Sequence, residues 1–134
     1  MNIQELNIGN WILWDNSWNN EPCKVVGIDP PLLELVDSNN KSISSVSINS
    51  VKPIEITSQI LIKNGFRQVF IDNSYYHKYE KENLDITCSQ HKGGFKCRIT
   101  IETKYERLCW VNIQYIHQLQ NACSLVDKEL EIKL

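Results

Sequence analysis

Residues 84–102, LDITCSQHKGGFKCRITIE, are the stretch that decides the fold of this chain. Apolar and polar residues alternate on both sides of Gly93 and Gly94, a pattern typical of an antiparallel hairpin with one buried face. Because both glycines can take positive φ, they predict the two central turn positions, which places Cys88 opposite Ile99. The predicted apolar face then holds Leu84, Ile86, Cys88, Cys97, Ile99 and Ile101.

Two more strands and a short helix are predicted upstream of this hairpin. Residues 68–72 and 75–80 flank a two-residue turn, so the four strands form an antiparallel meander. Thr57 is a good N-cap for a helix over 58–64, and Gly65 is placed to end it. Its crowded apolar residues predict a well-buried helix.

A longer helix is predicted near the C-terminus, from about Ile113 to Val126. Ile116, Leu119, Cys123 and Val126 recur at helical spacing and form one apolar stripe. We expect this stripe to lie on the apolar face of the meander. Residues 130–134 alternate between apolar and polar, which suggests a short terminal strand.

The first 56 residues predict a different unit, made of short strands separated by turn residues. The candidate strands are 11–14, 23–28, 32–37 and 43–48, followed by a tight turn into an extended exit at 48–53. Such a series in so short a segment predicts an SH3-like β-roll. The fold class is therefore α+β: a roll over 1–56, then a meander with one short and one longer helix over 57–134. The two parts are either separate domains or one compact unit.

Composition sets limits on the class of protein. The chain has 134 residues, is 42% hydrophobic and carries a formal net charge of −2, which fits one ordinary domain or two very small ones. No apolar run approaches the length of a membrane span, and the first residues lack the features of a signal peptide. We therefore expect a cytoplasmic protein whose five cysteines are small buried hydrophobes in a reducing compartment.

Three segments carry a family resemblance. Residues 4–12 read QELNIGNWI, residues 115–121 read YIHQLQN, and the connector has VKPI at 51–54, Thr57 and LIKNGF at 61–66. Together they resemble a family of small uncharacterised proteins from gut Bacteroidetes, their phages and mobile elements, with the pattern LxIGNWV…PIxLTEExLLKxGF…YxHQLQN.

The chain departs from the family pattern at three places. Ser58-Gln59 replaces the usual acidic pair, residues 122–125 replace an aromatic-rich stretch, and Val126-Asp127 replaces Thr-Gly. The first departure weakens the signal for the short helix, and the other two change what covers the core. The resemblance implies a phage or mobile-element origin and no particular activity.

Signatures of the common enzyme classes are missing from the sequence, which contains no P-loop, GxGxxG, HExxH or GxSxG motif. Cys88, His91 and Cys97 are the nearest approach to a zinc site, but the predicted register puts His91 on the other face and supplies no fourth ligand. We therefore predict no metal, no cofactor and no catalytic residue. His117 is the best candidate if the protein is an enzyme, with a helix residue bonded to a nearby loop as the alternative.

Several residues are candidates for binding a protein partner. Tryptophans near the N-terminus could line a groove in a roll, although a small core also needs large apolar side chains. Amides on the C-terminal helix could read a partner, or could form an internal packing network. The partner-binding candidates are Trp14, Trp18, His117, Gln118, Gln120 and Asn121.

A basic surface is the candidate for nucleic-acid binding. Residues 58–110 are net basic, and basic groups with Tyr75, His77 and Tyr79 on a neighbouring strand could hold a single strand on an open sheet. A solvated face of mixed charge is the alternative. The candidates are Lys92, Lys96, Arg98, Lys104 and Arg107.

The sequence thus favours a non-catalytic interaction module that acts on a protein partner. A nucleic-acid-binding accessory protein is the alternative function. The sequence predicts no membrane association and leaves the oligomeric state open.

Overall fold

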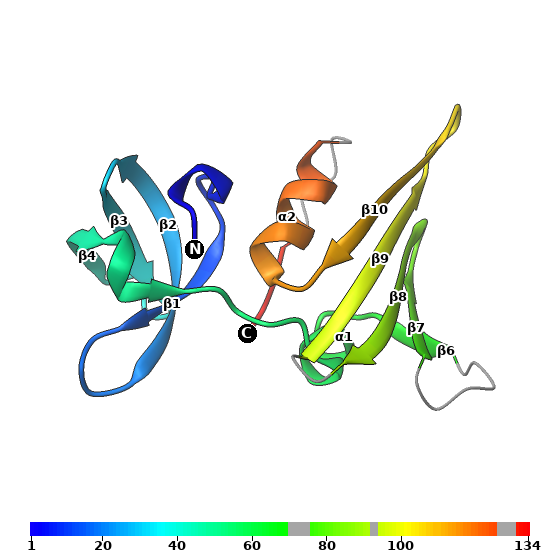
Figure 1. Cartoon of the computed structure of the whole chain (residues 1–134), viewed down its shortest axis with the longest axis horizontal. Helices are drawn as coiled ribbons and strands as arrows, with labels where there is room; N and C mark the ends of the chain where they lie inside the picture. The colour runs from blue at the N-terminus through cyan, green and yellow to red at the C-terminus, as the bar shows by residue number, and fades with distance from the viewer. Residues whose placement is uncertain (70–75, 92–93, 126–130) are drawn as a thin grey trace. The chain divides into compact units, whose positions relative to one another are not determined.

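The computed structural model describes residues 1–69, 76–91, 94–125 and 131–134 (Figure 1). The chain divides into two compact units: Met1–Ile54 with the segment that starts at Tyr115, and Glu55–Gln114 with Glu131–Leu134. Both units are built on antiparallel sheets, and each contains one α-helix among its described residues, so the fold is α+β. No helix within the described ranges is long and apolar enough to cross a membrane.

The first unit is a five-stranded antiparallel sheet in the order β4-β3-β2-β1-β5. Its elements are the 3₁₀ turn η1 (Ile3–Glu5), β1 (Trp11–Asp15), β2 (Asn20–Asp29), β3 (Leu32–Asp37), β4 (Ser42–Ser47), the 3₁₀ turn η2 (Ile48–Ser50), β5 (Val51–Lys52) and α2 (Ile116–Ser124). Alternate residues of the strands face one core, as the period of a strand requires. The buried members of that core are Leu6, Ile12, Cys23, Val25, Leu33, Leu35, Val46 and Val51.

The second unit is a five-stranded meander in the order β10-β9-β8-β7-β6. It consists of α1 (Ser58–Lys63), β6 (Arg67–Val69), β7 (Tyr76–Lys81), β8 (Leu84–His91), β9 (Gly94–Glu102) and β10 (Arg107–Ile113). The predicted apolar face is confirmed, because Leu84, Ile86, Cys88, Cys97, Ile99 and Ile101 are all buried. The hydroxyl of Tyr79 on β7 donates to Ser58 Oγ at 2.8 Å, which joins α1 to the sheet.

The short helix α1 has the predicted ends. Thr57 Oγ1 accepts a hydrogen bond from the Ile60 amide at 3.2 Å, and Gly65 follows the helix with a φ of 86°. A positive φ of this kind favours glycine, as the prediction required. The expectation that the whole helix is buried is wrong in part, because Leu61 is buried while Ile62 is exposed.

The hairpin register differs from the predicted one by two residues. Cys88 lies opposite Cys97, and His91 opposite Gly94. A shift of two keeps every side chain on its own face, so the alternation of apolar residues could not distinguish the two registers. The turn residues 92–93 lie outside the described residues, as does the predicted turn at Asn73-Ser74.

Four strands were predicted for the meander, and the structure has a fifth, β10. Its centre, residues 108–111, is apolar at successive positions and so shows no clear period of two. The C-terminal helix also begins later than predicted, at Ile116, because Ile113 ends β10.

Two expectations about the C-terminal segment also differ from the structure. Helix α2 groups with the first unit, whereas the sequence analysis placed it with the meander. The predicted terminal strand is not formed over residues 131–134, where the Lys133 amide instead donates to Asn64 Oδ1 at 2.6 Å. Leu130 and Val126 lie outside the described residues.

Replacing Ile86 by alanine tests the buried face of the meander. We expect Ile86→Ala to lower the free energy of unfolding by about 2–5 kcal/mol, because it leaves a cavity beneath the sheet. The neighbouring Thr87 points to the other face, so Thr87→Ala should cost less than about 1 kcal/mol. Urea unfolding followed by circular dichroism measures both, and equal losses would contradict the assignment of faces.

Candidate functional site

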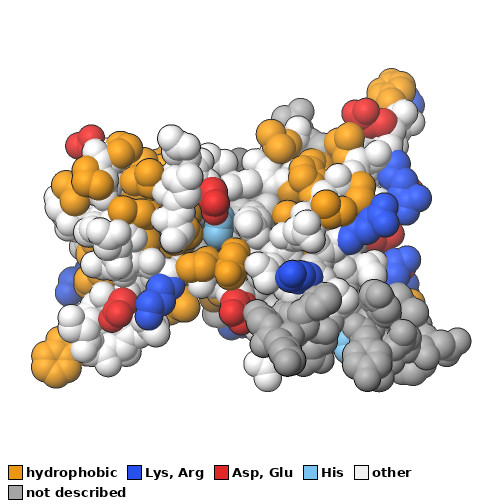
Figure 2. Space-filling view, viewed as in Figure 1, with side chains coloured by type: hydrophobic (Ala, Val, Ile, Leu, Met, Phe, Trp, Pro, Cys, Tyr) orange, Lys and Arg blue, Asp and Glu red, His pale blue; other side chains and the backbone are white. Residues whose placement is uncertain are grey.

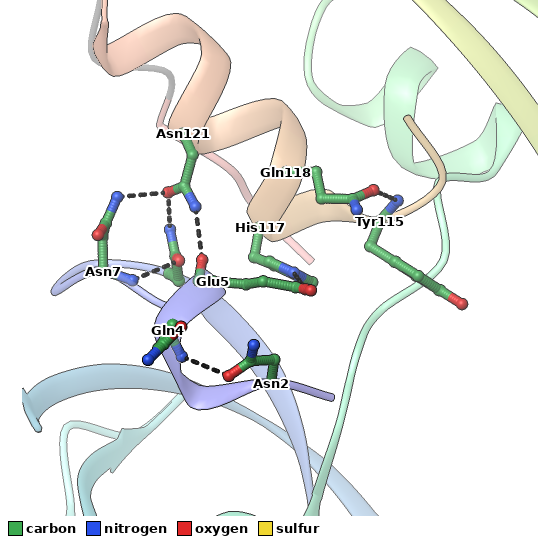
Figure 3. Close-up of polar contacts among 9 residues, drawn as sticks. Asn2, Gln4, Glu5, Asn7, Tyr115, His117, Gln118 and Asn121 are labelled. Carbon is green, nitrogen blue, oxygen red and sulfur yellow. Dashed lines mark hydrogen bonds and ion pairs between the residues drawn. The ribbon is translucent and has the colours of Figure 1, made fainter. Parts of the chain in front are cut away.

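The amides of helix α2 bond to the segment that leads into β1, within the first unit. Asn121 Oδ1 accepts hydrogen bonds from Asn7 Nδ2 at 3.0 Å and from Asn10 Nδ2 at 2.9 Å. Asn121 Nδ2 donates to the Glu5 backbone carbonyl at 2.8 Å (Figure 3). One side chain therefore joins three residues that lie more than 100 positions away in sequence.

Gln120 makes the same kind of contact one residue earlier on the helix. Its Oε1 accepts from the Trp11 amide at 3.0 Å, and its Nε2 donates to the Gly9 carbonyl at 3.1 Å. The side-chain amide thus pairs with the backbone much as a neighbouring strand would. Gln118 acts within its own helix, because its Oε1 accepts from the Tyr115 amide at 3.2 Å (Figure 3).

These bonds form the packing network that we named as the alternative to partner binding by the amides. Glu5, Asn7 and Asn10 are members of this network that the sequence analysis did not single out. The available signal was that two distant segments, 4–12 and 115–121, together carried the family resemblance. The structure brings those two segments together through side-chain amides.

His117 is buried at the start of α2, with 1% of its side chain exposed. Its ring stacks on Tyr115 at a centroid distance of 5.9 Å, and its Nε2 lies 3.5 Å from Glu5 Oε2 (Figure 3). Its Nδ1 is buried and has no hydrogen-bond partner in the described part of the chain. A ring so enclosed cannot meet a substrate unless the helix moves, so this geometry offers no support for a general base.

Burial is the main influence on the pKa of His117, and it lowers that pKa below its ordinary value. The nearby Glu5 carboxylate opposes this shift, while the positive amino terminus adds to it. His117 is therefore a neutral histidine held inside the first unit near neutral pH.

The two tryptophan candidates have different environments. Trp14 on β1 is half-buried and packs against the first core, whereas Trp18 is 93% exposed on the β1–β2 loop. The loop has a defined shape, because Asp15 Oδ1 accepts from the Ser17 amide and Asn16 Oδ1 accepts from the amides of residues 18 and 19. These bonds measure 3.0–3.1 Å.

Three of the basic candidates, Lys96, Arg98 and Arg107, lie on one face of the sheet, and acidic groups interrupt them there. Figure 2 shows Lys and Arg side chains over β9 and β10, with Asp and Glu side chains among them. Lys96, Arg98, Lys104 and Arg107 are exposed, and Lys92 lies outside the described residues. Arg107 Nε lies 3.9 Å from Glu102 Oε1, and Arg98 Nε donates to Cys109 Sγ at 2.9 Å.

The aromatic residues expected beside these basic groups lie on the other face of the sheet. His77 pairs with Cys88 and Tyr79 with Ile86, which places both aromatic side chains on the apolar face. Lys96 and Arg98 pair with Ser89 and Thr87 on the opposite face. Tyr75 lies outside the described residues. Among the described residues, His77 and Tyr79 therefore do not form a joint stacking surface with Lys96 and Arg98, as single-strand binding there would require.

Replacing Asn121 tests the amide network. Asn121→Ala leaves two amide donors and one carbonyl without their partner, so we expect a loss of about 1–3 kcal/mol in the free energy of unfolding. Ser124→Ala, on the exposed end of the same helix, is the matched control and should cost less than about 0.5 kcal/mol. Urea unfolding of both variants makes the comparison, and equal stabilities would show that the network contributes little.

The pH dependence of stability tests the environment of His117. Its lowered pKa means that the unfolded chain binds the proton more tightly, so stability should fall as the pH drops below about 6.5. The slope from this residue should not exceed about 1.4 kcal/mol per pH unit, and the loss should end below the folded-state pKa. His117→Gln should remove this component from a pH series of urea unfolding. A variant with the same slope as the parent chain would contradict the assignment.

Comparison of the chain with protein-family models, curated proteins and solved structures finds no match.

Proposed function

We propose that the chain is a non-catalytic interaction module that binds a protein partner, with Trp18 as its central contact. The observation that carries this proposal is the exposure of a large aromatic side chain on a loop of fixed shape. Tryptophan is among the residues that most often dominate binding energy, because it buries a large area with little loss of conformational freedom. A loop that is already ordered lowers the entropic cost of binding further.

Trp18 is also favoured as the partner contact because most of the other candidate partner-binding residues are engaged inside the first unit. The amides of Gln120 and Asn121 are engaged with the segment before β1, His117 is enclosed, and Trp14 contributes to the core. Trp18 shares none of these internal roles, since 93% of its surface is exposed. The side chain of Trp18 is therefore available for contact with another molecule.

We also propose that the first unit is an SH3-like roll. Its antiparallel strand order, β4-β3-β2-β1-β5, with a 3₁₀ turn between β4 and β5, supports this assignment. Register shifts after Val25 on β2 and after Leu33 on β3 bend the sheet, as closure into a roll requires. SH3 domains bind extended peptides through aromatic side chains, which agrees with a protein ligand.

The family resemblance adds a proposal about origin. Because residues 4–12 and 115–121 resemble segments of small proteins from gut Bacteroidetes and their phages, we propose a phage or mobile-element origin and action in the cytoplasm. Nucleic-acid binding is the less favoured function, because His77 and Tyr79 lie on the opposite face of the meander from Lys96 and Arg98. Capture from a native lysate with and without nuclease distinguishes nucleic-acid binding from binding of a protein partner.

Capture from a native lysate with matched variants tests the proposed function. We expect the tagged full-length chain to retain a protein partner, and Trp18→Ala to weaken that interaction at least tenfold. Tyr105→Ala is the matched control, because Tyr105 is also an exposed aromatic residue on a hairpin turn but belongs to the second unit. Quantitative mass spectrometry of the eluates, with and without nuclease, compares the three chains.

Two results would contradict the proposal. One is a set of bound proteins that does not change in Trp18→Ala. The other is a bound fraction that nuclease or moderate salt removes, which would point to nucleic acid instead. Equal melting temperatures of the variants are required for either comparison, and the exposure of both residues predicts that they are equal.

A further inference from the structure

Two cysteines of the second unit pair with each other across the strands β8 and β9. These strands are neighbours in the sheet (Figure 1). Cys88 and Cys97 are directly opposite each other in the antiparallel register, and both are buried on the apolar face. Their Sγ atoms are 2.6 Å apart, and both residues are free thiols in this structure. A disulfide bond is about 2.05 Å long, so the two sulfurs need to approach by only about half an ångström.

We propose that Cys88 and Cys97 are a redox pair that forms a disulfide across β8 and β9 when the chain meets a disulfide oxidant such as glutathione disulfide. Opposite residues of an antiparallel pair have Cβ atoms about 4.5–5.5 Å apart, and a disulfide needs about 3.5–4.5 Å. The hairpin therefore accepts the bond with a small local approach of its strands. This inference is independent of the proposed function.

The reaction is an ordinary thiol–disulfide exchange in two steps. The thiolate of one cysteine attacks a sulfur of glutathione disulfide, forms a mixed disulfide and releases one glutathione thiolate. The thiolate of the second cysteine then attacks the protein sulfur of that mixed disulfide and releases the second glutathione. The pair loses two electrons and two protons, and glutathione disulfide is reduced to two glutathione molecules.

The geometry selects this pair over the other cysteines. Cys109 on β10 is exposed and pairs with Thr100, so its side chain lies on the opposite face from Cys97. Cys23 belongs to the first unit, where it is buried in a different core. An exposed thiol at Cys109 should react fastest with reagents, but it has no described cysteine opposite it on the neighbouring strand.

Burial should make the exchange slow in the folded chain. The contact with Cys97 and burial raise the pKa of the Cys88 thiol above its ordinary value, so little thiolate is present near neutral pH. The oxidant must also reach a covered face. We expect the bond to form slowly in the native chain and faster during refolding, when the hairpin closes in the presence of the oxidant.

Intact mass after refolding tests the proposal. The full-length Cys109→Ser variant is refolded from urea in reduced and oxidised glutathione at several ratios, then quenched with acid and alkylated. We expect one intramolecular disulfide, and trypsin should release it as two joined peptides, since Lys92 and Lys96 lie between the cysteines in sequence. The melting temperature should rise by on the order of 10 °C and fall again with dithiothreitol.

A matched variant separates this pair from the remaining cysteines. Cys97→Ser in the same background removes the partner and should leave Cys88 open to alkylation in urea at every glutathione ratio. Two results would overturn the proposal: both thiols of the Cys109→Ser chain remaining alkylatable after refolding under oxidising conditions, or a disulfide that joins Cys88 or Cys97 to another cysteine.

Discussion

The hydrogen bonds from Gln120 and Asn121 to residues 5–11 are the interaction on which the organisation of the chain depends. They join residues 1–54 to the segment that starts at Tyr115, with residues 55–114 inserted between β5 and α2. These contacts are partly buried at Gln120 and at the buried Asn10, so a shift of the helix along this segment would leave polar groups without partners at a cost in free energy. The contact between Asn7 and Asn121 spans 114 positions, yet closing a long loop costs only logarithmically more than closing a short one.

The strand pairings of the inserted segment, residues 55–114, are local. The strands of the second unit are neighbours in sequence order from β6 to β10, so each hairpin closes over a short loop. The first unit needs the more distant contact, and its small core of aliphatic residues gains a helix only when α2 joins it.

The alternation of apolar and polar residues identified the buried face of each strand, but it did not identify which residues lie opposite each other on neighbouring strands. The face that holds Ile86 and Ile99 was predicted correctly, whereas the register was not, because a shift of two residues conserves the face. The stripe through Ile116 and Leu119 likewise predicted a helix but not the unit it joins, since any apolar face would cover it. That choice is made by polar groups: Gln120 and Asn121 find partners only where backbone amides and carbonyls are open to them. Sequence alone does not show where those groups are.

The candidate partner-binding residues also differ in surroundings that the sequence does not show. Trp14 and Trp18 look alike in the sequence, yet one packs on the core and the other is exposed, because the strand ends between them. The loop around Trp18 is ordered by the side chains of Asp15 and Asn16, and Ser17 takes a φ of 72°, a backbone conformation that costs energy for a residue other than glycine. The ordered loop does not stabilise the chain by burying Trp18, because 93% of this residue is exposed. Under the proposed function, a partner removes this side chain from water and the order of the loop lowers the entropic cost of binding, whereas the helix amides are already bonded within the first unit.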